Sequence, residues 1–197
     1  GTSHYFGTGF AEAFGIQFLN KENKLETPYQ TSWGCTTRMI GGLIMTHSDD
    51  SGLVLPPKIA PIKVDIIPIG GNEKVQEVVT RLKEELHEKK ITYIVDDSDK
   101  TPGYRFAEAE VKGYPIRVEI GPRDLENNEV ALVRRDTLEK IKVSTKNVVE
   151  NILELLEQIQ ENLYKRALER RNSMMYNISS YEELKEMSKK AGGFAFV

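Results

Sequence analysis

The sequence is short of several features that would mark particular classes of protein. Only one of its 197 residues, Cys35, is a cysteine, so neither an internal disulfide nor a cysteine-rich zinc site can form within the chain. No stretch approaches the roughly 18 consecutive apolar residues of a membrane span. Charge of one sign is not in excess, since 27 Lys and Arg stand against 30 Asp and Glu. We therefore expect a soluble globular chain that cannot hold nucleic acid by bulk electrostatics alone, so that any such contact is local and specific.

The first residues carry no export signal. Gly1-Thr2-Ser3-His4 has neither the basic start nor the apolar stretch of a signal peptide, and no Met opens the chain. We therefore expect a fragment of a longer protein. A single cysteine is also typical of a reducing compartment, so we expect a cytoplasmic protein with no membrane partner.

The pattern of apolar residues predicts three successive parts. Residues 1–60 contain short strands and turns, followed by an apolar run typical of a strand that leads into a buried helix. The segment 52–61 contains three prolines, which exclude regular helix and indicate a stiff connection. Residues 61–145 alternate strand and helix, and residues 146–197 are mostly helical. We therefore predict an α/β (α+β) protein with a domain boundary near residue 60.

The second part is predicted to form a mixed sheet with helices packed on it. Apolar residues at helical spacing from Val75 to Leu86 indicate an amphipathic helix between two strands, which is a parallel βαβ unit. A short helix is bounded by Thr101-Pro102 and Gly113, residue types that favour helix starts and ends. The elements expected from residue 62 onward are strands 62–69, 91–95, 116–120, 130–134 and 140–143 and helices 73–90, 102–111, 147–170 and 181–189.

The run from Thr31 to Arg38 concentrates hydroxyl groups and small residues at a predicted strand-to-helix junction. Such a junction suits a nucleotide. Gly34 would let a planar ring approach the backbone, the Thr36 hydroxyl could bind ribose or phosphate, and the Arg38 guanidinium could grip phosphate oxygens. An ordinary packed turn with an exposed arginine has the same composition, so the pattern alone leaves both interpretations open.

Three longer stretches resemble class II prolyl-tRNA synthetases. The run TSWGCTTRMIGGLIMTHSDDSGLVLPPKIAP is similar to motif 3 of that family, GTSHYFGTGFAEAF to its proline-pocket strand, and TPGYRFAEAEVKGYPIRVEIGPRD to its anticodon-binding domain. The similarity covers nearly the whole chain and is greatest to the eukaryotic and archaeal-type branch, which some bacteria share. It implies the C-terminal edge of the class II antiparallel core (residues 1–60), a mixed-sheet α/β anticodon-binding domain (61–145), and a helical connection with the start of a C-terminal extension (146–197).

The resemblance also implies roles for residues near motif 3. Arg38 matches the arginine that grips the ATP phosphates and is the expected catalytic residue. No covalent nucleophile is expected, because attack of a carboxylate on the α-phosphate needs mainly positioning and charge stabilisation. ATP and Mg²⁺ would serve as substrate and activator, and no metal site is expected within this chain. The implied ATP-binding residues are Thr2, Thr36 and Arg38, and the implied proline-binding residues are His4, Ser32, Trp33 and Gly34.

Anticodon recognition requires chemistry that the middle of the chain could supply. An unpaired guanine presents N1–H and N2–H donors and an O6 acceptor, which Glu and Arg side chains match. Phe106 and Glu110 lie four residues apart on the predicted short helix, hence on one face, while Arg117 and Glu119 share the polar face of the next strand. Solvated charges and a core Phe106 would fit the same pattern.

By the resemblance, Phe106 stacks on a base, Glu110 and Arg117 read the second and third anticodon bases, and Arg123 and Asp124 assist. Other charged residues suggest weaker hypotheses. Arg134-Arg135 could neutralise backbone phosphates or cap a strand edge. The spacing of His47 and Asp49-Asp50 matches no closed set of metal ligands, and a helix end with solvated acids fits them better.

The resemblance thus implies a proline–tRNA ligase, which activates proline with ATP to prolyl-adenylate and transfers it to tRNA(Pro). Motifs 1 and 2 are not in this sequence, so we expect the chain alone to be inactive, and the parent to form a homodimer through the part of the catalytic core absent here. Two other classes remain as hypotheses. One is a non-catalytic tRNA-binding accessory protein derived from a synthetase anticodon domain, and the other is a small α/β ligand-binding module without an RNA partner.

Overall fold

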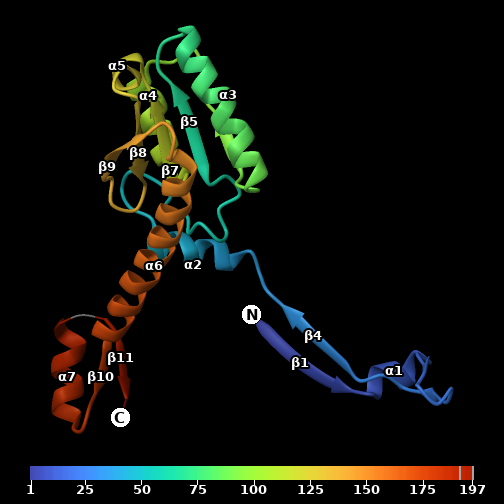
Figure 1. Cartoon of the computed structure of the whole chain (residues 1–197). Helices are drawn as coiled ribbons and strands as arrows, with labels where there is room; N and C mark the ends of the chain where they lie inside the picture. Colours follow the sequence, from blue (N-terminus) through green and yellow to red (C-terminus); the bar gives the residue numbers. More distant parts are fainter. Residues whose placement is uncertain (191, 197) are drawn as a thin grey trace. The chain divides into compact units, whose positions relative to one another are not determined.

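The computed structural model of the chain describes residues 1–190 and 192–196 and divides into two compact units, Gly1–Leu43 and Ile44–Val197 (Figure 1). The division falls inside one helix, α2 (Arg38–His47).

The first unit is built on paired strands. β1 pairs antiparallel with β4, and β2 pairs antiparallel with β3. The Asn20 side chain shapes the turn between β2 and β3, because its oxygen accepts hydrogen bonds from the backbone N–H groups of Glu22 and Lys24, both at 2.9 Å. The short strands and turns predicted for the start of the chain are thus confirmed here. The elements are β1 (Thr2–Gly7), α1 (Gly9–Ala13), β2 (Phe18–Leu19), β3 (Leu25–Glu26) and β4 (Gln30–Gly34).

Residues 1–43 bury very little. Ala11 is the one buried residue among them. The predicted helix after β4 is confirmed as α2, but none of its residues is buried in this chain, and Met39 and Ile40 are exposed. The apolar run that predicts a buried helix therefore has no covering partner in the part of the chain that the structure describes.

A five-stranded mixed sheet forms the centre of the second unit. Its strand order is β6-β5-β7-β8-β9, with β5 parallel to β6 and β7, and β8 antiparallel to β7 and β9. The predicted βαβ unit is confirmed, and the strands predicted at 130–134 and 140–143 pair as the closing hairpin of the sheet. The strands are β5 (Val64–Pro68), β6 (Tyr93–Val95), β7 (Ile116–Ile120), β8 (Glu129–Arg134) and β9 (Lys140–Ser144).

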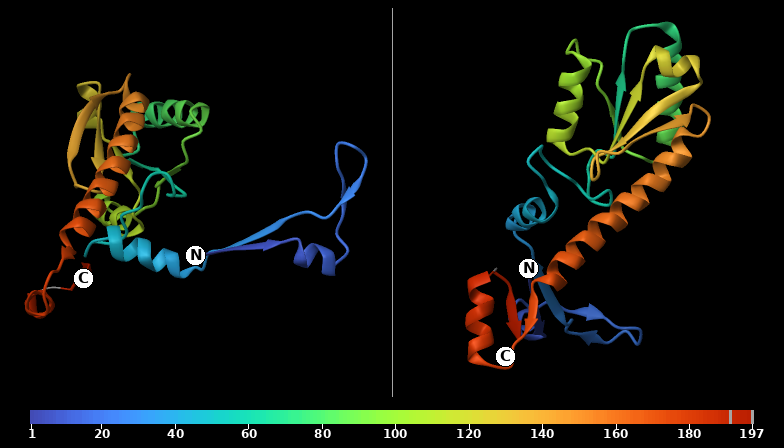
Figure 2. Two further views of the ribbon diagram at one scale, coloured as in Figure 1. Left: turned by 90° about the horizontal axis from the view of Figure 1, so that it is seen from below. Right: turned by 90° about the vertical axis from the view of Figure 1, so that its left-hand side faces the viewer.

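Helices cover the two faces of this sheet unequally. The helices α3 (Glu73–Glu88) and α6 (Val148–Ser173) pack on one face, and α4 (Pro102–Lys112) lies on the other, as the right-hand view of Figure 2 shows. The face under α3 and α6 is apolar and holds the main core, to which β7 contributes Ile116, Val118 and Ile120. The alternate residues of β7, Arg117 and Glu119, therefore point to the α4 side.

The ends of the helices follow the signals in the sequence. The Asn72 side chain caps α3 by accepting a hydrogen bond from the Val75 N–H at 2.9 Å. The helix α4 begins after Thr101 with Pro102 in its first turn, and it ends at Gly113, whose φ of 74° is left-handed. The predicted limits of α4 are confirmed to within one residue.

The segment after α2 belongs to the second unit and packs on the rest of it. The Leu53 N–H donates to the Val111 carbonyl at 3.1 Å, the Lys58 N–H donates to the Gln160 side chain at 3.0 Å, and Val54 and Ala60 are buried. The division of the structure therefore falls before the proline-containing connection. The domain limits predicted from the sequence remain predictions, because packing within this chain does not test them.

Past the sheet, the chain continues through α6 into a small α/β element. The strand β10 (Met175–Asn177) pairs in parallel with β11 (Phe194–Phe196), and α7 (Tyr181–Lys190) connects them. Two five-residue helices, α1 and α5 (Pro122–Glu126), were not predicted, because one turn and a half is too short to show a period. None of the helices in the described residues is long and apolar enough to cross a membrane.

Candidate functional site

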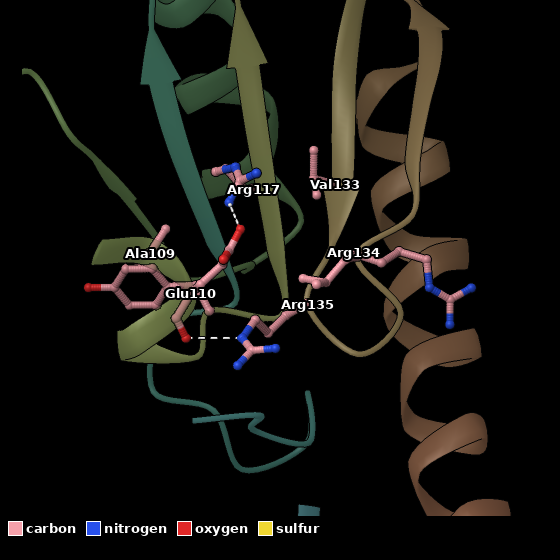
Figure 3. Close-up of a pocket in the computed structure, with 8 residues that line it drawn as sticks. Ala109, Glu110, Arg117, Val133, Arg134 and Arg135 are labelled. Carbon is pink, nitrogen blue, oxygen red and sulfur yellow. Dashed lines mark hydrogen bonds and ion pairs between the residues drawn. The ribbon is translucent and has the colours of Figure 1, made fainter. Parts of the chain in front are cut away.

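A cluster of charged side chains lies where α4 crosses the polar face of β7 (Figure 3). The Arg117 guanidinium is at its centre. Its Nη1 donates to Glu110 Oε1 at 3.0 Å, a bond that Figure 3 shows. Nη1 also donates to the Phe106 carbonyl at 3.1 Å, and Nε donates to Glu119 Oε1 at 3.0 Å. The guanidinium carbon also sits 4.6 Å from the centre of the Phe106 ring. The structure thus brings together Phe106, Glu110 and Arg117, which the sequence placed on facing elements.

Glu119 and Lys140 complete this cluster from within the sheet. Glu119 is 3 % exposed, and its second carboxylate oxygen accepts from Lys140 Nζ at 2.5 Å. One buried carboxylate therefore holds two cations in place, which fixes the Arg117 side chain in one orientation. Lys140 was not among the predicted site residues. Its alternation with Lys142 along β9 is the signal that could have pointed to it, because alternate strand residues share a face.

The two predicted assisting residues lie on α5. Asp124 binds Lys142 through Nζ and Oδ1 at 2.8 Å, which connects α5 to β9. Arg123 is exposed and makes no ion pair in the described part of the chain. Neither residue forms a hydrogen bond or ion pair with Arg117 or Glu110.

The residues expected to bind ATP and proline lie on the paired strands β1 and β4. His4 is opposite Ser32 in the register, and Thr2 is opposite Gly34. Because directly opposed residues share a face of an antiparallel pair, these four positions are on one side of the ribbon. A Cβ added to Gly34 would lie 3.0 Å from Thr2 Oγ1, which confirms that the two residues meet.

Trp33 is on the other face of the same ribbon. It pairs with Ser3, one residue out of step with Ser32 and Gly34, and it is 81 % exposed. The structure therefore does not bring Trp33 to the face that carries His4.

Thr36 and Arg38 lie where the chain turns from β4 into α2. The Thr36 carbonyl accepts a hydrogen bond from the Met39 N–H at 3.0 Å, and Arg38 is the first residue of the helix. The Arg38 side chain is exposed and makes no ion pair with the described residues. Its guanidinium is free to meet a ligand.

Acidic and histidine side chains do not gather into a metal centre in the described residues, where no group of three or more could hold an ion. His47, at the end of α2, has a pKa lowered by burial and by the nearby Arg166. Asp49 forms an ion pair with Arg135.

Comparison with known proteins identifies the part of the chain that carries the cluster on α4 and β7. Residues 63–155 match the family model described as the anticodon binding domain. The chain contains an anticodon-binding domain. Its sheet β6-β5-β7-β8-β9, with helices α3 to α5, lies within the matched residues, and so does the first part of α6.

The similarity extends beyond this domain. The proline–tRNA ligase of Lachnospira eligens is 51 % identical over 98 % of this chain. That of Mycoplasma mycoides is 48 % identical over the full length of this chain. A protein of Bacillus thuringiensis called proline–tRNA ligase 2 is 49 % identical over 98 % of the chain. In each case the match covers 41 % of the relative. The chain thus spans about two fifths of the length of the curated relatives it matches.

The anticodon-binding domain offers donors and acceptors at the Arg117 cluster. Nη2 of Arg117 and Oε2 of Glu110 make no hydrogen bond with the described residues, so they can serve as donor and acceptor toward a base edge. One face of the Phe106 ring is already covered by the guanidinium. The cavity behind Glu110 and Arg117 has a volume of about 10 Å³. It has room for about one water, so a larger ligand could reach these side chains only from the solvent-exposed side.

Two further arginines of the anticodon-binding domain, Arg134 and Arg135, are buried and paired with acids, which counts against the hypothesis that they neutralise backbone phosphates. Arg134 forms a bidentate pair with Asp136 at 3.0 and 2.8 Å, and Arg135 forms one with Asp49 at 2.7 and 2.6 Å. The bond from Arg135 lowers the pKa of Asp49. Burial opposes ionisation of Asp136, but hydrogen bonds from Arg134 and Asn162 still hold its pKa below the usual value. Neither arginine is available for phosphates.

The domain also contains an unpaired acid beneath α4. Asp65 of β5 is 2 % exposed, and its Oδ1 atom has no hydrogen-bond partner in the described chain. Burial, together with repulsion from Asp96, raises the pKa of Asp65 to about 7. This carboxyl lies directly beside Arg117 in the sheet register.

Proposed function

We propose that this chain is the motif 3 and anticodon-binding portion of a proline–tRNA ligase. The parent enzyme activates proline with ATP and Mg²⁺ to prolyl-adenylate, then transfers the prolyl group to tRNA(Pro). The observation that carries the proposal is identity of about half over essentially the whole chain to several proteins named proline–tRNA ligase. The accessory-protein hypothesis has no such support, since these relatives are named as ligases.

In this proposal the two units have separate tasks. Arg38 stabilises the phosphates of ATP, with Thr2 and Thr36 as further nucleotide contacts, and His4, Ser32 and Gly34 shape the proline side. Trp33 lies on the opposite face of the ribbon, so it belongs to the proline site only if that site includes both faces. The geometry that supports the assignment is the shared face of Thr2, His4, Ser32 and Gly34.

The anticodon-binding domain reads tRNA(Pro) through the cluster around Arg117. Glu110 accepts hydrogen bonds from the N–H groups of a guanine, Arg117 donates to O6, and the Phe106 ring stacks on a base. Arg123 and Asp124 assist from α5. Lys140 contributes positive charge at the same face, where Glu119 holds it.

The remaining parts of the proposal concern the whole enzyme. We propose a cytoplasmic homodimer of the eukaryotic and archaeal-type branch, whose dimer contacts lie outside this chain. The relatives named above are all bacterial, which is compatible with that branch because some bacteria share it. Residues 146–197 are proposed to connect the anticodon-binding domain to a C-terminal extension.

Binding of RNA by this chain tests the anticodon assignment. A fluorescent stem-loop with the proline anticodon should bind more tightly than one with its guanines replaced. Glu110→Ala should abolish this preference, and Arg117→Ala should weaken binding of the proline loop by roughly 1 to 3 kcal/mol. Equal binding of both stem-loops by the unaltered chain would contradict the assignment.

Proline-dependent exchange of pyrophosphate into ATP tests the catalytic assignment in a polypeptide of the relatives' length that carries these residues. Arg38→Ala should lower exchange while leaving stem-loop affinity nearly unchanged, because the phosphate contact and the anticodon contact are separate. Absence of exchange in the unaltered enzyme would favour the accessory-protein hypothesis. Loss of both activities in Arg38→Ala would indicate unfolding and would contradict the two-site assignment.

A further inference from the structure

The residue proposed to read the anticodon, Glu110, is held from two sides by two different arginines (Figure 3). Its carboxylate accepts from Arg117 at 3.0 Å, and its backbone carbonyl accepts from Nε of Arg135, also at 3.0 Å. The same carbonyl accepts from the Gly113 N–H at 3.2 Å at the end of α4. A cation at this position also interacts favourably with the C-terminal end of the helix dipole.

Arg135 joins this turn of α4 to a distant segment of the chain. Its other two nitrogens, Nη1 and Nη2, bind both carboxylate oxygens of Asp49 at 2.7 and 2.6 Å. The Arg135 side chain is 2 % exposed, whereas that of Asp49 is 46 % exposed. Asp49 is the acid that compensates this buried charge, and the planar fork of an arginine fixes the distance and orientation of both partners.

The backbone around Asp49 is fitted closely to the end of α4. Asp49 and Gly52 exchange two backbone hydrogen bonds of 3.2 Å, which close a tight turn. Gly52 has a φ of +142°, and a Cβ there would lie 2.4 Å from Val111 Cα and 2.9 Å from the Glu110 carbonyl oxygen. The next residue, Leu53, donates its N–H to the Val111 carbonyl at 3.1 Å. The turn therefore lies against the peptide that joins Glu110 to Val111, so closely that position 52 has no room for a side chain.

We propose that Arg135 and Asp49 are positioning residues for anticodon recognition, which lock the turn 49–52 that follows α2 onto the turn of α4 bearing Glu110. The lock fixes the direction in which Glu110 presents its carboxylate. By linkage, RNA bound at Glu110 stabilises the turn 49–52, and an intact turn improves discrimination between anticodons. This inference rests on the proposed anticodon function.

The first test uses discrimination by the chain itself. The ratio of dissociation constants for the changed and the proline stem-loop should fall about fivefold or more in Asp49→Asn, since coupling between sites is typically 5- to 150-fold. Arg135→Lys, which keeps the charge but loses the fork, should do the same. Glu108→Gln, on the same helix as Glu110, is the matched control, because it removes the pairs with Lys100 and Lys112 without changing the contacts of Arg135 and Asp49. Its ratio should stay unchanged.

The second test measures the linkage directly by amide hydrogen exchange. Addition of the proline stem-loop should slow exchange of the Gly52 and Leu53 amides about fivefold or more in the unaltered chain and in Glu108→Gln, but not in Asp49→Asn. Far-UV circular dichroism and thermal unfolding show whether each variant is folded. A merely structural ion pair would lower the unfolding temperature and leave the ratio of dissociation constants as it was.

The outcomes separate this inference from the proposed function. If the unaltered chain prefers the proline stem-loop but Asp49→Asn and Arg135→Lys are folded and retain the full preference, the positioning role is wrong and the anticodon function stands. If the unaltered chain shows no preference, the anticodon function fails and the positioning role falls with it.

Discussion

The two units of this chain contrast in what they do with their apolar side chains. Among residues 1–43 only Ala11 is buried, and Tyr5, Phe14, Tyr29 and Trp33 are all mostly exposed. The second unit contains the large buried cluster, in which Ile66, Val75, Leu86, Ile116, Ile152 and Ile159 are almost completely hidden from solvent. Because no further layer covers the paired strands of the first unit, their apolar side chains stay in contact with water and add little to its stability.

This contrast indicates which part of the chain can fold by itself. Burial of apolar surface is the main favourable term in folding, and a two-stranded ribbon is marginal in water. In the proposed synthetase, the rest of the catalytic core covers the first unit, whereas the anticodon-binding domain carries its own core. The following predictions test this difference, beginning with the largest effect.

Separate expression of the two units should give opposite results. Residues 44–197 should unfold in one cooperative transition with urea, because they contain the entire buried cluster. Residues 1–43 should show no cooperative transition, since nothing but Ala11 is buried there. Circular dichroism as a function of urea measures both. A sharp transition in the isolated first unit would overturn the comparison.

Truncation of one large side chain in each unit should change the free energy of unfolding by very different amounts. Ile152→Ala removes a fully buried side chain of α6 and should lower the free energy of unfolding by about 2–5 kcal/mol. Trp33→Ala, at an exposed position of β4, should change it by less than about 0.5 kcal/mol. Urea unfolding of the whole chain compares the two. Similar losses in both variants would mean that Trp33 packs against a core in solution.

The buried acid of the second unit should make its stability depend on pH. Asp65 has a folded pKa of about 7 against an ordinary 3.8, so between these values the folded state keeps a proton that the unfolded state has lost. Stability therefore falls as pH rises from about 4 to 7. Above pH 7 the whole loss is present, at most about 4 kcal/mol for a shift of about three units.

Asp65→Asn removes this ionisation while keeping the size of the side chain. The unaltered chain should therefore lose stability relative to Asp65→Asn as the pH rises from 5 to 8.5, and the difference between their free energies of unfolding should change accordingly. Urea titrations at both pH values measure it, and effects of the other titrating groups cancel in the difference. Parallel pH profiles for the two proteins would show that Asp65 is not buried as an unpaired acid.

The smallest expected effect comes from adding one methyl group to a helix in each unit. Gly41 in α2 and Gly103 in α4 both have free space where a Cβ would lie. Gly103→Ala should raise the free energy of unfolding by about 0.5 kcal/mol through helix propensity. Gly41→Ala should leave the cooperative transition unchanged, because the first unit takes no part in it. A stabilising effect of Gly41→Ala would instead extend the cooperative unit to α2.

The sequence predicted the second unit well because its signals are local and repeated. The period of α3, with Val75, Leu82 and Leu86 on one face, gave its limits to within two residues. Pro102 and Gly113 marked the two ends of α4, and alternation marked β7. The βαβ unit and the closing hairpin follow from the order of these elements. The helices α1 and α5 were missed because five residues carry no period.

The candidate site was predictable only in its outline. Spacing on α4 and β7 put Phe106 and Glu110 on one face and Arg117 on a polar face, and the structure brings the three together. Lys140 joins them from 21 residues beyond Glu119, and its alternation with Lys142 marks a face of β9 but not the carboxylate that it meets. The sequence also left Arg134-Arg135 ambiguous, because only packing reveals that both are buried and paired.

The sequence by itself determined the approximate limits of the longer helices and of the strands of the mixed sheet, and which of their faces are apolar, because caps, prolines and periodicity act over a few residues. Which charged groups meet was decided by tertiary structure alone. Arg135 reaches Asp49 across 86 positions of sequence, and Asp65 became an unpaired buried acid only when α4 closed over the sheet. Such pairings depend on the register of strands and the docking of helices, which bring distant residues within the few ångströms over which a hydrogen bond acts.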